Sequence, residues 1–258
     1  MNGAFEIGKV ALRSQQRALE TTANNIANVN TPGFKRSDVI FSEVFADGAS
    51  PATLVEDLAR ADFAGSGGVR VDTRNAISAQ GELRQTGEML DIAIEGAGFI
   101  ELLGPEGQVW LWRGGRLAIN RDGYLAGPQK LALKALIGIP DDATGIAIDR
   151  SGVVVARTAD EGQVELGQIT LVRAESDAAV ERVDGGLFRL ASDTRAIEDI
   201  PGEAGAGTIA QGMIEESNVD FSAAMIELLM IQRAYAASAQ IVQSADQLSA
   251  ITNNLKRG

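Results

Sequence analysis

The sequence predicts an α+β protein in which long N- and C-terminal helices pair as a coiled-coil-like stalk, with an antiparallel β domain inserted between them. Residues 5–28 contain no proline and one glycine, and residues 220–255 contain neither. The chain between these ends consists mainly of short runs that alternate apolar and polar residues, which is the pattern of half-buried strands. Two helical terminal segments around a central β domain therefore place the chain in the α+β fold class.

Composition limits the functions that the chain can have. Of 258 residues, 45% are hydrophobic, which is enough for a core, and 35 acidic residues against 23 basic ones give a net charge of −12. An acidic chain of this kind lacks the basic footprint of a nucleic-acid-binding protein. There is no cysteine and no histidine, so thiolate chemistry is excluded and the commonest general base and metal ligand is missing.

These absences argue against an enzyme. The acidic pairs Asp141-Asp142 and Asp160-Glu161 are candidate general acids or bases, but solvated loop carboxylates are the commoner explanation. We expect no catalytic residues, no cofactor and no metal site. No run of the sequence approaches the length of a membrane span, and the N-terminus lacks the apolar core of a cleaved signal peptide.

The N-terminal helix is expected to carry a narrow apolar stripe. Its apolar line, spaced by seven, is Phe5, Leu12, Leu19 and Ile26, with Ala4, Ala11 and Ala18 beside it. The second line that a coiled coil would use is Gly8, Gln15 and Thr22, which is mostly polar. Asparagine tolerates the left-handed conformation past a helix end, so the helix should end at Ala27 or Asn28.

The C-terminal helix has two longer heptad lines. One is Phe221, Leu228, Tyr235 and Val242, and the other is Ala224, Ile231, Ser238 and Ala245. Ser217 and Asp220 are expected to cap its start. A helix over residues 220–255 would span about 54 Å, too long for a small compact domain to cover. Its partner is either the N-terminal helix or neighbouring copies of the chain.

The β middle is predicted from local patterns. Leu90, Ile92 and Ile94 share one face of a strand, residues 146–155 form a hairpin around a glycine-containing turn, and residues 167–172 form one strand. Gly96–Gly98 indicates a bend. Trp110 and Trp112 share a face of one strand, for which packing in the core or at a domain interface is favoured over a ligand platform.

These patterns divide the chain into four segments. They are an N-terminal axial helix and turn over 1–36, an extended arm over 37–80, the antiparallel β domain over 81–206 and the C-terminal axial helix over 207–258. Removing residues 1–36 and 210–258 is expected to leave a folded β fragment.

The stretch NNIANVNTPGFKR, residues 24–36, ends the first helix. Pro32-Gly33 fits the centre of a type II turn, after which Phe34 has a defined direction and Lys35 and Arg36 can approach carbonyls or acidic groups. Asn24 and Asn28 lie one helical turn apart on one face. Side-chain amides that donate and accept suit contacts between identical subunits.

Three segments carry a resemblance to a known family. ANNIANVNTPGFKR near the start, GELRQTGEMLDIAIEGAGFI in the middle, and QGMIEESNVDF with MIQRAYAASAQ near the end resemble the bacterial flagellar rod and hook family of axial proteins. GVRVDTRNAISAQGEL is similar to distal rod proteins, whereas LVRAESDAAVERVDGGLFRL is similar to proximal ones. Ala236 stands where the family often has an acidic residue after the tyrosine of QRAY.

The resemblance implies a structural subunit of the flagellar basal-body rod, which polymerises helically into the axle that transmits torque across the periplasm. It implies four kinds of partner: copies of the chain, other rod and hook proteins, the surrounding ring bushing and the export apparatus. It implies neither nucleic-acid binding nor membrane insertion, and export without a cleaved signal. A hook or proximal-rod subunit, or a β binding module with oligomerisation helices, remains the alternative.

Sixteen residues are predicted to make subunit contacts, from the two helices and the turn that follows the first. They are Leu12, Leu19, Asn24, Asn25, Ile26, Asn28, Pro32, Gly33, Phe34, Phe221, Leu228, Ile231, Gln232, Arg233, Tyr235 and Val242.

Overall fold

The structure is a computed structural model that describes residues 2–44, 68–105, 107–158, 162–176, 179–183, 185–191 and 194–255. The turn-rich runs ADGASPATL and FAGSGG of the predicted arm lie outside these residues. The chain forms two compact units. The helical unit consists of Met1–Ile26, Ser37–Arg74 and Phe221–Gly258, and the β unit of Ala27–Arg36 and Asn75–Asp220.

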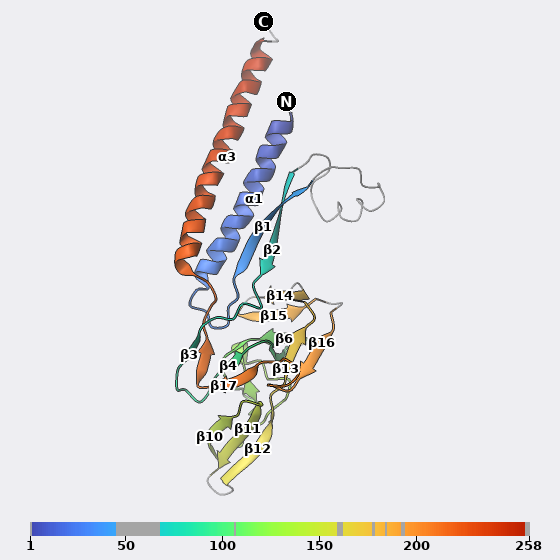
Figure 1. Cartoon of the computed structure of the whole chain (residues 1–258), viewed down its shortest axis with the longest axis vertical. Helices are drawn as coiled ribbons and strands as arrows, with labels where there is room; N and C mark the ends of the chain where they lie inside the picture. The colour runs from blue at the N-terminus through green and yellow to red at the C-terminus, as the bar shows by residue number, and fades with distance from the viewer. Residues whose placement is uncertain are drawn as a thin grey trace. The chain divides into compact units, whose positions relative to one another are not determined.

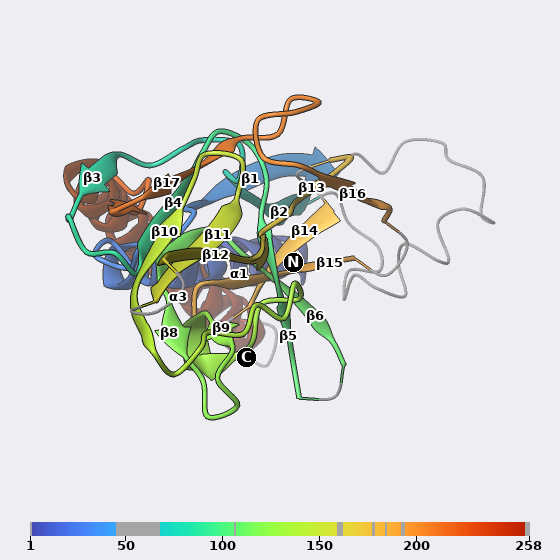
Figure 2. The ribbon, with the colours of Figure 1, turned by 90° about the horizontal axis from the view of Figure 1, so that it is seen from below.

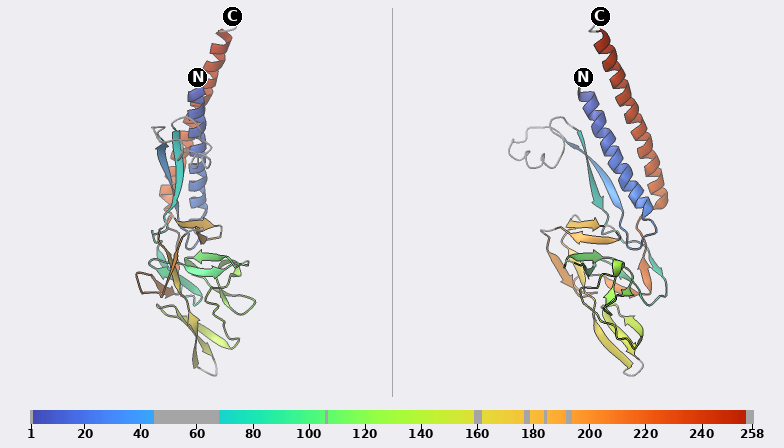
Figure 3. Two further views of the ribbon diagram at one scale, coloured as in Figure 1. Left: turned by 90° about the vertical axis from the view of Figure 1, so that its right-hand side faces the viewer. Right: turned by 180° about the vertical axis from the view of Figure 1, so that it is seen from behind.

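Two helices and a two-stranded sheet make up the helical unit. Helix α1 is Asn2–Ala27 and helix α3 is Phe221–Leu255, as the sequence predicts. They lie side by side and run in opposite directions (Figures 1 and 3), since Gly8 lies against Val242 and Gln15 bonds to Ser238. The α+β class is confirmed, whereas coiled-coil supercoiling of the helices stays a prediction.

The two strands of the helical unit are β1 (Ser37–Val44) and β2 (Gly68–Asn75). They pair with each other within the segment that the sequence assigns to an extended arm. Asn25 of α1 is bonded to the first residue of β1, because its side chain donates to the Ser37 carbonyl and accepts from the Ser37 amide, at 2.8 and 3.0 Å.

The β unit is built from short strands in several small sheets, and every pairing recorded among its described strands is antiparallel. The sheets have the orders β14-β15-β6-β5, β17-β4-β7, β10-β11-β12, β13-β16, β18-β3 and β8-β9. The first half of the strands is β3 (Leu83–Gln85), β4 (Asp91–Glu95), β5 (Ile100–Leu103), β6 (Val109–Trp112), β7 (Gly114–Arg116), β8 (Ala118–Ile119) and β9 (Leu125–Ala126).

A short 3₁₀ turn, η1 (Pro128–Lys130), separates these strands from the second half. The later strands are β10 (Ala143–Ile148), β11 (Val153–Thr158), β12 (Gly162–Gln168), β13 (Leu171–Ala174), β14 (Val180–Val183), β15 (Leu187–Leu190), β16 (Ala196–Asp199), β17 (Thr208–Gln211) and β18 (Met213–Glu215). Strands β10, β11 and β12 lie side by side in both views (Figures 1 and 2).

The core of the β unit forms around β4. Four consecutive residues of this strand, 91–94, are buried, and because successive side chains point to opposite faces, both faces of β4 are covered. Ile92 and Ile94 belong to the main apolar cluster together with Trp112, and Trp110 packs against it. The tryptophans are therefore core residues, as favoured from the sequence.

Of three local predictions from the sequence, one is confirmed by the structure and two are wrong. The hairpin is confirmed as β10–β11. The single strand over 167–172 is wrong, because β12 ends at Gln168, β13 begins at Leu171 and the two strands belong to different sheets. Ser217 does not cap α3, because its hydroxyl accepts from the Val219 amide and the helix begins only at Phe221.

The C-terminal boundary of the β unit also differs from the pattern-based division. Residues 207–220, assigned from the sequence to the C-terminal helical segment, contain β17 and β18. Strand β17 pairs with β4, so it is a central part of the β unit. Residues 27–36 likewise belong to this unit.

The turn between β10 and β11 should be sensitive to a methyl group. Gly152 has φ +84° and a Cβ there would lie 2.3 Å from the Ile169 carbonyl oxygen, whereas Gly87 has φ +73° and open space around it. Gly87→Ala should lower the free energy of unfolding by about 1–2 kcal/mol through backbone strain alone. Gly152→Ala should cost more, because the carbonyl must move. If denaturant titrations gave the same loss of unfolding free energy for Gly152→Ala and Gly87→Ala, the close approach of Gly152 to the Ile169 carbonyl would be contradicted.

Candidate subunit-assembly surface

Helix α3 exposes large apolar side chains around much of its circumference. Only Glu227, Arg233 and Asp246 are charged among its 35 residues. A helix that is apolar all round needs cover on more than one side, and a continuous exposed apolar surface marks an interaction site. The exposed large apolar residues of α3 are Phe221, Met225, Ile226, Leu229, Met230, Tyr235, Ile241 and Ile251, with Met230 66% and Ile241 65% exposed.

The predicted contact residues of α3 divide into two groups. Phe221, Tyr235, Gln232 and Arg233 are exposed, while Leu228, Ile231 and Val242 are half-buried. Val242 contacts Gly8 of α1, so it takes part in the pairing of the two helices within the chain. The exposed group is the part of the prediction that is accessible to another subunit.

The predicted residues of α1 lie in three environments. Leu12, Leu19 and Ile26 are half-buried, and Asn24 is exposed. Asn25 is 6% exposed, because it is bonded to Ser37. Asn25 therefore faces its own chain, which the sequence alone left open.

The turn after α1 has the predicted geometry. The Phe34 amide donates to the Thr31 carbonyl at 3.2 Å, and Gly33 between them has φ +69°, as a type II turn requires. The hydroxyl of Thr31 donates to the Asn28 side chain at 3.2 Å. Pro32 is exposed.

The same turn is fixed to the β unit by Gly33 and Phe34. The Gly33 amide donates to the Glu215 carbonyl at 2.8 Å. Phe34 is 3% exposed, and the Arg182 guanidinium lies 4.6 Å from its ring centroid. These two residues are thus packed within the chain, and sequence reasoning had placed them at a subunit contact.

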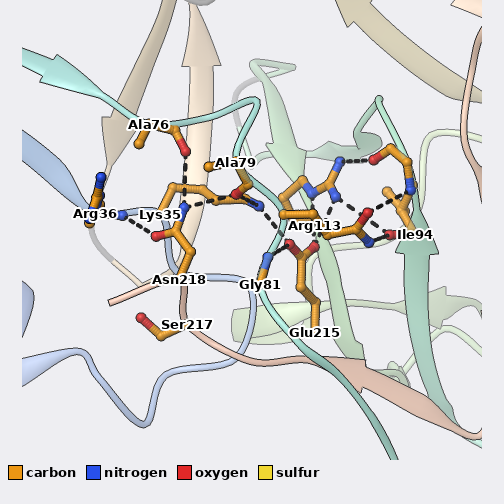
Figure 4. A network of polar contacts seen from close by, with 12 residues as sticks. Lys35, Arg36, Ala76, Ala79, Gly81, Ile94, Arg113, Glu215, Ser217 and Asn218 are labelled. Carbon is orange, nitrogen blue, oxygen red and sulfur yellow. Dashed lines mark hydrogen bonds and ion pairs between the residues drawn. The ribbon is translucent and has the colours of Figure 1, made fainter. Parts of the chain in front are cut away.

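A buried ionic cluster lies beside this turn (Figure 4). The Lys35 ammonium contacts Glu215 Oε1 at 2.5 Å, and Arg113 Nη2 donates to Glu215 Oε2 at 2.9 Å. All three side chains are at most 4% exposed. Two cations around one carboxylate leave one net positive charge in the interior, which must be balanced by further polar partners.

Backbone groups supply those partners. Arg113 Nη1 donates to the carbonyls of Gly96 and Gly98 at 2.9 and 2.7 Å, and Lys35 donates to the Ala79 carbonyl at 2.7 Å. The Gly81 amide donates to Glu215 at 2.9 Å. The ionic cluster therefore joins residues of the β unit that are far apart in the sequence.

Asn218 extends the cluster toward the start of α3. Its side-chain oxygen accepts from the Arg36 amide at 2.7 Å, and its side-chain nitrogen donates to the carbonyls of Ala76 and Ala79 at 3.0 and 2.8 Å (Figure 4). The residues just after α1 and just before α3 are thus bonded to each other in the β unit. Sequence reasoning did not assign Arg113, Glu215 or Asn218 to a site. Two clues were present: Lys35 was expected to approach acidic groups or carbonyls, and QGMIEESNVDF contains both Glu215 and Asn218.

A shallow cleft of about 420 Å³ opens nearby in the β unit, lined by Pro32, Arg84, Gln85, Thr86, Asp91, Arg116 and Ile214. Arg116 donates to Asp91 at 2.9 Å, and this bond holds the pKa of the Asp91 carboxyl below its usual value. A carboxylate kept ionised by an arginine is a structural ion pair rather than a poised general base.

The described residues contain no group of three or more acidic, histidine or cysteine side chains arranged to hold a metal ion. Among the helices that the structure describes, none is both long and apolar enough to cross a membrane.

Three family models match the chain in order. Residues 5–35 match the flagella basal body rod protein model, residues 93–156 the D1 domain of the flagellar hook protein FlgE/F/G, and residues 210–255 the C-terminal model of the flagellar basal body rod FlgEFG proteins. The first and last cover the two helices and the residues of the ionic cluster next to them. The class is therefore that of flagellar axial proteins.

Full-length relatives make this more specific. The chain is 32% identical to FlgG of Borreliella burgdorferi, over 95% of this chain and 96% of that protein, and 31% identical to FlgG of Bacillus subtilis, over 97% of both. FlgF of Caulobacter vibrioides is 32% identical over 96% of both chains. The chain belongs to the flagellar basal-body rod protein family, and its several FlgG relatives support the predicted likeness to distal rod proteins.

Adjacent glutamates allow a matched test of the ionic cluster. Glu215→Gln should lower the free energy of unfolding by about 3–5 kcal/mol, because Lys35 and Arg113 would remain buried without their counter-charge. Glu216→Gln removes an exposed contact with Arg84 and should change it by no more than about 1 kcal/mol. Chemical denaturation of both variants measures the difference, and a Glu215→Gln loss no larger than that of Glu216→Gln would refute the cluster's role.

The limits of the β unit give a second test. A fragment cut at the sequence-based limits, lacking residues 1–36 and 210–258, loses Lys35 and Glu215 and leaves Arg113 buried and uncompensated. We now expect it to unfold without a cooperative transition. Residues 27–220 retain the whole cluster and should unfold cooperatively in circular dichroism. A cooperative transition in the shorter fragment would show that the cluster is dispensable.

Proposed function

We propose that this chain is a structural subunit of the flagellar basal-body rod and that it polymerises through its terminal helices. The observation that carries the proposal is the exposed apolar circumference of α3, with Met230 and Ile241 about two-thirds exposed. An interface that repeats head to tail without closing generates an open helical filament. A helix with uncovered apolar residues on several sides suits such an assembly, because each subunit meets more than one neighbour.

The proposal extends to the place and task of the assembly. The rod is the periplasmic axle that transmits motor torque, and the β unit lies in its outer part around the helices. Copies of the chain and other axial proteins are its direct partners, as the family relationship implies. The ring bushing around the rod and the flagellar export apparatus are further proposed partners. No catalytic role is proposed for any residue.

Contacts with other subunits are assigned first to the exposed predicted residues, Asn24, Gln232, Arg233, Tyr235 and Phe221, and to the apolar residues exposed beside them. Leu12, Leu19, Ile26, Leu228 and Ile231 are half-buried and are proposed to serve both the chain's own helix pair and its neighbours. Leu228 is therefore a poor choice for a test, because an acidic residue there would disturb both surfaces.

Met230 is the better choice. Met230→Asp places a charge where the free chain has water, so the fold should keep its free energy of unfolding within about 0.5 kcal/mol. In the assembly the charge would be buried against a neighbour, which is strongly unfavourable. A strain that lacks this gene should regain motility with the natural chain but less than a tenth of it with Met230→Asp.

Gln240→Asp provides the control, since Gln240 is an exposed polar residue of the same helix. It adds the same charge without removing apolar surface and should restore most of the motility. Secretion of both variants, measured in the culture medium, separates assembly from export. Full motility with Met230→Asp would disprove assembly through this face of α3.

A further inference from the structure

The covered face of α1 is made of unusually small and polar residues. Gly8, Ser14, Ala18 and Thr22 are buried, whereas the larger Leu12, Leu19 and Ile26 are only half-buried. Large apolar side chains that interlock hold two helices in one relative position. Of these buried residues, Gly8 is the one recorded against α3, beside Val242, whereas Asn25, on the same side of α1 as Ser14 and Ala18, is bonded to β1. The bonded residues that follow α1 and precede α3 hold one end of the helix pair, so contacts between the helices themselves must fix their alignment along the rest of its length.

We propose that Gln15 and Ser238 set the register of α1 against α3, with Gly8 as a second marker. Gln15 Nε2 donates to Ser238 Oγ at 3.0 Å across the helix pair. Gly8 gives room to Val242, because a Cβ at position 8 would lie 2.4 Å from Val242 Cγ2. The two contacts lie about two turns apart on α1 and about one turn apart on α3, and both form in one alignment of the helices.

If α1 slides along α3 by one heptad, the same faces of the two helices still meet. This slipped alignment is therefore the competing one that the sequence must exclude. The line of α3 to which Ser238 belongs is Ala224, Ile231, Ser238 and Ala245. A slip of seven residues brings Ile231 or Ala245 opposite Gln15. Neither side chain accepts a hydrogen bond, so the buried amide would lose its partner, at a cost that the native register avoids.

Gly8 also disfavours the slip that brings Ile231 opposite Gln15, in addition to the lost hydrogen bond. When Ile231 moves opposite Gln15, Tyr235 moves to the place of Val242. A tyrosine ring is much larger than the isopropyl group that fits beside Gly8. The polar pair and the glycine thus act against the same misalignment.

Gln15 also lowers the stability of the helix pair, and this cost distinguishes a role in setting the register from simple stabilisation. Its Oε1 is buried and finds no hydrogen-bond partner among the described residues. A polar residue at one core position of a helix pair specifies alignment at the expense of stability. Leucine at position 15 should therefore leave the helices at least as resistant to heat while removing the preference for one alignment. The proposal concerns the helix pair of a single chain and does not depend on the rod function.

The natural chain lacks cysteine, which makes site-directed spin labelling direct. Ala23→Cys and Gln247→Cys place labels at exposed positions of α1 and α3, and pulsed electron resonance measures their separation in the full-length chain. The natural Gln15 should give one distance. Gln15→Leu should give a second population, displaced along the helix axis by about 10 Å, which is seven residues at about 1.5 Å each.

Two variants complete the test. Ser238→Ala removes only the accepting hydroxyl and should produce the same second population. Gln16→Leu alters the neighbouring exposed glutamine, which bonds to Glu20, and should keep the single distance. The proposal is overturned if Gln15→Leu and Ser238→Ala both keep that distance, if the chain with natural Gln15 has no defined distance, or if Gln15→Leu lowers the melting temperature of the helices.

Discussion

The structure of the β unit depends on the pairing of one buried carboxylate, Glu215, with Lys35 and Arg113. The Lys35–Glu215 contact joins residues 180 positions apart, and the closure entropy of so long a loop must be compensated by what the contact gains. Burial makes the arrangement highly specific, since an ammonium, a guanidinium and a carboxylate in the interior are tolerated only when all are paired. The cluster therefore requires the residues after α1 and before α3 to meet at one point of the unit.

This constraint has a consequence for assembly. The terminal helices of one chain enter and leave the β unit through residues that are bonded to each other by Lys35, Glu215 and Asn218. Family models match residues 5–35 and 210–255, and each matched segment includes a helix together with its share of these contacts. The likeness to rod proteins thus extends beyond the helices to the residues that join the two ends of the chain.

The helix pair shows how the same residues divide between two tasks. The covered face of α1 is small and partly polar, while the larger apolar residues of α3 face outward. Burial of apolar area inside a chain usually takes the largest side chains, so their exposure in α3 favours contacts outside the chain. Hydrogen bonding from Gln15 to Ser238 and close packing at Gly8 supply within the chain the specificity that apolar bulk would otherwise provide.

Local patterns were sufficient for the features that depend on neighbouring residues. The absence of proline, with one glycine in the first segment and none in the second, predicted both helices nearly to their last residue, and Pro32-Gly33 predicted its turn, because backbone propensity acts over a few positions. The break at residues 169–170 was missed, because apolar alternation continues across it, whereas β12 pairs with β11 and β13 pairs with β16. Residues 207–220 were misassigned for a related reason, since strand pairing with β4 is a contact between distant segments that composition does not record.

The sequence by itself determined the α+β class, the long apolar C-terminal helix and the family to which the chain belongs. Only the tertiary structure decided that Asn25, Gly33 and Phe34 serve their own chain, that Arg113 and Glu215 complete the site of Lys35, and that Gln15 meets Ser238. The physical reason is that periodicity places a side chain on a face of its own helix or strand. Which partner that face meets depends on packing between segments far apart in the chain, where a buried charge or amide accepts only a partner that satisfies it.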